Sequence, residues 1–102
     1  MKECCRKYLD EQFAGDADVI NEIYGEYVVS VKAKLDEAKT ALAAQEWLPL
    51  DRIAHTIKGN ALAAGDEAMA QTAIELRGAA HLKDDATAAG LVAKLEELST
   101  LL

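Results

Sequence analysis

One segment of the chain places reactive side chains at helical spacing where packing alone does not require them. It runs from Ala54 to Gly65 and reads AHTIKGNALAAG. Successive residues of a helix turn by about 100°, so His55 falls opposite Ile57, and Lys58 follows it by one turn. A neutral imidazole nitrogen is a nucleophile near neutral pH, and an ammonium beside it can hold an anion. The segment therefore predicts a solvent-facing, nucleophilic histidine with a cation beside it.

The same helix face carries a glycine and a leucine. Gly59 costs a helix on the order of 1 kcal/mol relative to alanine, so a helix that keeps it uses the vacant space for a neighbour or a partner. The wheel places Gly59 beside His55 and away from Ile57, which favours a partner over intramolecular packing. Leu62 would widen an apolar contact area around the imidazole. From these residues alone, a functional His55 site and an ordinary surface histidine both remain open.

The segment resembles the His-x-Leu-Lys-Gly-Ser-x pattern of histidine phosphotransfer (HPt) domains, the helical carriers of two-component phosphorelays. The matching positions are Ala54, His55, Lys58, Gly59 and Gly65, with Glu75 and Leu76 near the family's later Leu-Glu region. Ile57 replaces the commoner leucine and Asn60 the commoner serine, and neither change touches the phosphoryl-accepting chemistry. The helical pattern around the motif extends the resemblance over nearly all of the chain.

The resemblance implies a role for each residue of the motif face. His55 would exchange a phosphoryl group with an aspartate of a response-regulator receiver domain, and Lys58 would hold the phosphoryl oxygens. Gly59 would leave room for the receiver's loops. The residues expected to contact the partner are Arg52, Gly59, Leu62 and Ala63. A sensor histidine kinase is a second implied partner. Mg²⁺ belongs to the receiver, so this chain is expected to hold no metal or cofactor of its own.

Helical periodicity covers nearly the whole chain. It predicts a short helix over residues 3 to about 13, a long one from Asp16 to Leu42, and the motif helix from Pro49 to near Gly65. Asp66 caps a fourth helix, and residues 83–85 separate it from a last one. Residues 45–48 are expected to turn the chain. The predicted core positions are Cys5, Leu9, Phe13, Ile20, Ile23, Tyr27, Val31, Leu35, Ala38, Leu42, Leu50, Ile53, Ile57, Ala61, Ala64, Met69, Ala73, Leu76, Ala80, Leu91, Leu95, Leu98 and Leu102.

Four amphipathic helices joined by short turns bury their apolar stripes together when neighbours pack antiparallel. The predicted fold is therefore all-α, an antiparallel up-down-up-down four-helix bundle with a short additional N-terminal helix. The 102 residues suffice for one domain with one core, so residues 1–102 are expected to form a single HPt domain. Such a domain is expected to be a monomer.

Charge and composition narrow the partners to proteins. The net charge is −7, with 11 basic residues scattered among 18 acidic ones, which disfavours nucleic acid and anionic membrane surfaces. No apolar run approaches the roughly 20 residues of a membrane span, and residues 1–5 lack the apolar core of a secretory signal. We therefore expect a cytoplasmic protein without membrane insertion. Cys4 and Cys5 are expected to be reduced thiols, one packed against the bundle and the other near the surface.

Two other classes of function stay open beside the phosphoryl carrier. A helical adaptor would bind a partner through the same face without chemistry. A metal- or haem-binding bundle would pair His55 with His81, but no Cys or carboxylate stands at ligand spacing. His81 is instead expected at its helix end or on the surface, and Glu75 and Arg77 on a solvated face. No phosphate-binding loop or convergent catalytic triad is recognisable, so no autonomous kinase activity is expected.

Overall fold

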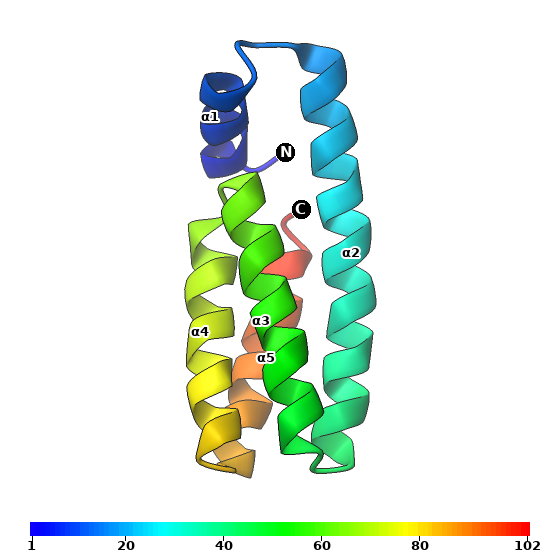
Figure 1. Cartoon of the computed structure of the whole chain (residues 1–102), viewed down its shortest axis with the longest axis vertical. Helices are drawn as coiled ribbons and strands as arrows, with labels where there is room; N and C mark the ends of the chain where they lie inside the picture. Colours follow the sequence, from blue (N-terminus) through cyan, green and yellow to red (C-terminus); the bar gives the residue numbers. More distant parts are fainter.

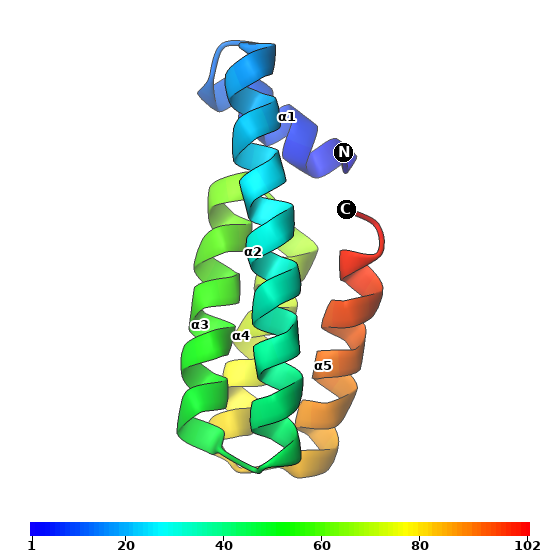
Figure 2. The same cartoon turned by 90° about the vertical axis from the view of Figure 1, so that its right-hand side faces the viewer.

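The computed structural model describes all 102 residues and consists of five helices. They are α1 (Glu3–Gln12), α2 (Ala17–Ala43), α3 (Trp47–Ala64), α4 (Glu67–His81) and α5 (Asp85–Ser99). Both α2 and α4 pack against α3 and α5, so the four long helices close into a bundle. Successive helices run in opposite directions, and α1 lies at one end against α2 and α3 (Figure 1, Figure 2). The fold is the four-helix bundle with an added N-terminal helix that the sequence predicts.

Aspartate caps and left-handed residues keep the turns short. Asp16, Asp66 and Asp84 each accept a hydrogen bond from the backbone N–H three residues further on, at 3.3, 3.4 and 3.2 Å. Such N-caps satisfy amide groups that have no partner in the first helical turn. α3 ends at Gly65, where φ is +76° and a Cβ would overlap the side chain of Tyr8. Only Gly65 and Asp66 therefore connect α3 to α4.

The turn before α3 lies earlier than the sequence predicts. The chain reverses at residues 44–46, where Gln45 has a φ of +53°, and Trp47 and Leu48 are already helical. The prediction that these two residues turn the chain is wrong. The sequence predicts a helix start at Pro49, but proline fits anywhere in the first turn because its missing N–H would have no partner there.

The core is built from aliphatic and small side chains, and most predicted core positions are buried. Phe13 is an exception at 37 % exposed. On α5 the prediction from leucines alone is off by about one position. Its buried apolar residues are Ala88, Val92 and Leu95, while Leu91, Leu98 and Leu102 are half-buried at the edge of the core. Small residues facing inward let α5 approach α4, whose own core face is rich in alanine. None of the helices combines the length and apolar character that crossing a membrane requires.

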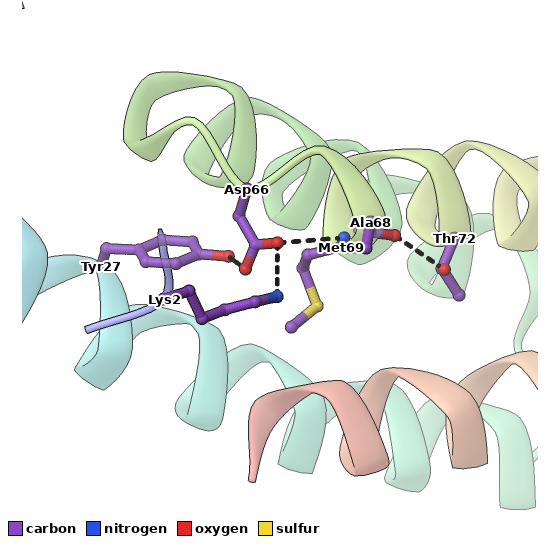
Figure 3. Close-up of polar contacts among 6 residues, drawn as sticks. All are labelled: Lys2, Tyr27, Asp66, Ala68, Met69 and Thr72. Carbon is purple, nitrogen blue, oxygen red and sulfur yellow. Dashed lines mark hydrogen bonds and ion pairs between the residues drawn. The ribbon is translucent and has the colours of Figure 1, made fainter. Parts of the chain in front are cut away.

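Asp66 joins three parts of the chain at the end of the bundle where α1 lies (Figure 3). Its fully buried carboxylate accepts hydrogen bonds from the Lys2 ammonium at 2.8 Å and the Tyr27 hydroxyl at 2.7 Å. Burial and this hydrogen bond raise the pKa of Tyr27 well above its ordinary value. A buried carboxylate is tolerated when it is paired and hydrogen-bonded, as Asp66 is. The cluster fixes the residue before α1 to α2 and to the start of α4.

The two cysteines divide as the sequence predicts. Cys5 of α1 is buried, Cys4 is exposed, and both are free thiols. Burial and the nearby Asp66 carboxylate raise the pKa of Cys5 from 9.0 to about 12. Cys5 therefore stays protonated across the physiological range and acts as a small packing residue.

Candidate functional site

His55 lies on the solvent face of α3, at the ninth of its 18 residues. Ala54 and Ile57, on either side of it in the sequence, are fully buried and hold the helix against the core. The ring therefore points outward, as the helical wheel predicts. His55 lines none of the hollows in the protein surface. It stands on the exposed face of a helix, where a second protein can reach it.

Two cations of α3 flank His55, each about one turn away. Arg52 is exposed on the N-terminal side, and Lys58 is half-exposed on the C-terminal side. Lys58 pairs with none of the carboxylates in the structure. Its ammonium is therefore available to an anion that arrives at the histidine.

The next turns of the same face offer space and apolar surface. A Cβ built on Gly59 would meet nothing within 4 Å, so no neighbouring helix occupies the vacancy. Leu62 is 53 % exposed, and the adjoining Ala63 is also exposed. Ala63 lines a groove of about 290 Å³ between α2 and α3. The four residues predicted to contact a partner, Arg52 among them, thus share the exposed side of α3.

Asn60, which replaces the family's commoner serine, has a structural role here. Its side-chain amide donates a hydrogen bond to the Ser30 hydroxyl of α2 at 2.7 Å. This contact ties the motif helix to the longest helix of the bundle, at the groove that Ala63 also lines. The amide of Asn60 is therefore bonded to α2.

A residue that the sequence analysis missed touches the ring of His55. Arg77 extends from α4, with Nη1 3.1 Å from His55 Nδ1 and Nε 2.9 Å from Asp51 Oδ1. Of the two residues predicted on a solvated face, Glu75 is exposed, whereas the Arg77 side chain is 32 % exposed and lies between Asp51 and His55. His81, the last residue of α4, is largely exposed, as predicted, and its Nε2 lies 3.2 Å from the same Asp51 oxygen. Arg77 and Asp51 thus link the two histidines, and no group of three His, Cys, Asp or Glu side chains converges anywhere in the structure.

These contacts set the electrostatics of the site. The hydrogen bond from Arg77, helped by His81, lowers the pKa of Asp51 against the opposing effect of its burial. Asp51 therefore stays ionised at neutral pH and holds the guanidinium beside the imidazole. The cations Arg52, Lys58 and Arg77 outnumber this one carboxylate around His55. The site is locally positive although the chain carries −7, which suits a negatively charged group.

The short α3–α4 connection contains the signal that would have found Arg77. His55 and Arg77 each lie 11 residues from Asp66, and Asp51 and His81 each lie 15 residues from it. In an antiparallel helical hairpin, positions equally far from the turn come to lie side by side. A helical wheel of one helix at a time cannot show this, because the contact joins two helices.

The fold and the site define a class of small helical bundles that present a histidine on a rigid, solvent-facing helix. The family model described as the Hpt domain matches residues 22–101, from early α2 to the end of α5. The chain therefore belongs to the Hpt family, the histidine phosphotransfer domains of phosphorelays. No curated protein and no solved structure matches the chain significantly.

Proposed function

We propose that this chain carries a phosphoryl group on His55 and exchanges it with an aspartate of a response-regulator receiver domain. The observation that supports this proposal is the exposed imidazole with an unpaired ammonium one turn further along α3 and open space at Gly59. In the proposal His55 is the nucleophile and Lys58 the cation that holds the phosphoryl oxygens. A sensor histidine kinase is a second source of the group.

In the proposal the ring nitrogen that reacts is Nε2, because Nδ1 faces Arg77 of α4. The reacting tautomer carries its proton on Nδ1, with the guanidinium moved away from the ring. The Nε2 lone pair attacks the phosphorus of an aspartyl phosphate on the partner. An N–P bond forms, the P–O bond breaks, and its electron pair remains on the partner's carboxylate. The ring then loses the proton on Nδ1 to solvent. The reverse sequence returns the group to a carboxylate.

The remaining contributions are shared between the two proteins. Charge in the transition state lies mainly on the phosphoryl oxygens, where Lys58 and the partner's Mg²⁺ stabilise it. Arg52, Gly59, Leu62 and Ala63 form the surface on which the receiver binds. The proposal includes no autonomous kinase activity, because the sequence contains no Gly-rich phosphate-binding motif.

Incubation with receiver domains charged by acetyl phosphate, followed by mass spectrometry, tests the proposal. We expect one phosphorylated residue, His55, with a label that is lost in acid and stable in alkali. His55→Gln should abolish labelling, whereas the matched variant His81→Gln should retain it. Both variants should keep native helicity, because each side chain is exposed. A receiver that binds the chain without labelling it would favour the adaptor function instead.

A further inference from the structure

The contact between Arg77 and His55 fixes which ring nitrogen carries the proton. A guanidinium only donates hydrogen bonds and is always protonated in proteins. At 3.1 Å from Arg77 Nη1, Nδ1 must therefore be the acceptor, and the proton of a neutral ring lies on Nε2. The electron pair of an N–H nitrogen belongs to the aromatic system, so Nε2 is not nucleophilic in this form. The observed arrangement is a resting form that cannot accept a phosphoryl group at Nε2.

A ring phosphorylated at Nε2 is compatible with the contact between Nδ1 and Arg77. With the phosphoryl group on Nε2, a neutral ring has no N–H and offers a lone pair at Nδ1, which Arg77 can accommodate without moving. Hydrolysis is fast when Nδ1 takes up a proton, because the ring then leaves as neutral imidazole. In that step water attacks phosphorus, the N–P electron pair returns to Nε2, and Nδ1 keeps its proton. A guanidinium beside Nδ1 opposes this protonation by occupying the lone pair and by charge repulsion.

We propose that Arg77 is a positioning residue that releases Nδ1 while His55 accepts a phosphoryl group and re-engages it to protect phosphohistidine from hydrolysis. The proposal rests on the assignment of His55 as the phosphoryl-carrying residue. It adds a second state of Arg77, in which the guanidinium turns away from the ring.

Asp51 makes the two states possible. Its carboxylate accepts a hydrogen bond from Arg77 Nε, whereas Arg77 Nη1 faces His55. Arg77 can therefore break its contact with the ring and still be held to α3 by Asp51. The other charged groups near the ring are Arg52 and Lys58 on α3 and His81 on α4. Of these, His81 shares the Asp51 oxygen with Arg77. His81→Gln is therefore included in every pH series, so that an effect that reaches Arg77 through His81 and Asp51 is recognised.

The first test measures the tautomer without any phosphorylation. Long-range ¹H–¹⁵N NMR of the imidazole distinguishes Nε2–H from Nδ1–H in the neutral ring. We expect Nε2–H in the native chain and a measurable gain of Nδ1–H in Arg77→Ala, with Arg77→Lys as a second variant that retains a charge. Lys94→Ala, which removes an exposed lysine of α5, is the control and should change nothing. A native ring that is already Nδ1–H would overturn the proposal.

The second test measures the lifetime of phosphohistidine. Phosphoramidate phosphorylates histidine directly, so the labelled chain can be prepared without any receiver, and mass spectrometry follows the loss of label from His55 between about pH 5 and 9. In Arg77→Ala, hydrolysis at neutral pH should be about tenfold faster, the effect of losing one charge-assisted hydrogen bond. The midpoint of its acid acceleration should move to higher pH, which a merely structural effect would not produce.

The two proposals fail in different ways. Equal lifetimes and equal pH midpoints in the native chain and in Arg77→Ala would overturn the role of Arg77, whatever receivers do. A native chain that holds a label from phosphoramidate but never exchanges it with a receiver would overturn the carrier function and leave the role of Arg77 standing. Circular dichroism of each variant verifies that the bundle is intact.

Discussion

Gly59 separates folding stability from partner binding, because nothing inside the protein occupies the space beside it. A Cβ at this position meets no atom within 4 Å, and the residue lies in the interior of α3 with no left-handed backbone. Gly59→Ala should therefore gain the helix propensity of alanine without a clash. The free energy of unfolding should rise by about 1 kcal/mol, and the melting temperature by about 5 °C.

Activity should not follow stability at this position. Gly59→Glu also improves helix propensity, but it places a carboxylate one turn from His55, where it repels the incoming phosphoryl group and fills the space proposed for the receiver. Transfer from a charged receiver should then fall by at least tenfold while the melting temperature stays at or above the native value. Gly90→Ala is the matched control, since Gly90 is also helical, exposed and free of close neighbours, on α5.

Thermal unfolding by circular dichroism and a receiver-transfer time course measure both properties on the same samples. Gly90→Ala should be stabilised like Gly59→Ala and transfer like the native chain. A melting temperature lowered by several degrees in Gly59→Ala would mean that a neighbour fills the vacancy. Normal transfer by Gly59→Glu would remove Gly59 from the binding surface. Either result would refute the reasoning.

Three further predictions follow from single contacts. Lys58→Ala should slow transfer by about tenfold, the effect of one charge-assisted hydrogen bond, and Lys58→Arg should restore part of it; transfer kinetics that do not change would leave Lys58 without a role. A thiol reagent should label Cys4 rapidly and Cys5 only on unfolding. Rapid labelling of both thiols in the native chain would contradict the burial of Cys5. Folding raises the pKa of Cys5 from 9.0 to about 12, so the contribution of this thiol to stability is complete below pH 9 and is lost between pH 9 and 12. Denaturant titrations at several pH values can measure this loss. Asp66→Ala should lower the free energy of unfolding by about 3 to 5 kcal/mol, because it leaves Lys2 and Tyr27 without their partner. The control Asp16→Ala, at an exposed cap, should lower it by about 1 kcal/mol. Equal losses in the two variants would show that the buried cluster contributes nothing beyond capping.

Local signals in the sequence predict most of the fold. Aspartates at N-caps and apolar residues at spacings of three and four are read directly from the chain, and the helices end within a few residues of the predicted positions. The errors lie where packing between helices decides. On α5, Val92 is buried in the core and the larger Leu91 is only half-buried at its edge. That choice depends on a neighbour the sequence pattern does not name.

In the candidate site, too, the features that depend on a single helix are predicted, and the contact between two helices is not. The outward direction of His55 and the open space at Gly59 follow from one helix, and a wheel predicts both. The proximity of Arg77 to the ring depends on how α4 pairs with α3. Once the two-residue connection at Gly65 and Asp66 is recognised, that pairing follows by counting outward from the turn.

The residues that stop α3 and start α4 therefore do more than terminate helices. Gly65 is required twice, by its positive φ and by the overlap that any side chain would have with Tyr8. Asp66 is fixed by Lys2 and Tyr27, so the turn cannot slide along the bundle without breaking a buried ion pair. A shift of α4 by one residue would turn Arg77 by about 100° and remove it from Nδ1. The position of the guanidinium beside the imidazole is thus held by a turn that lies 11 residues away along each helix.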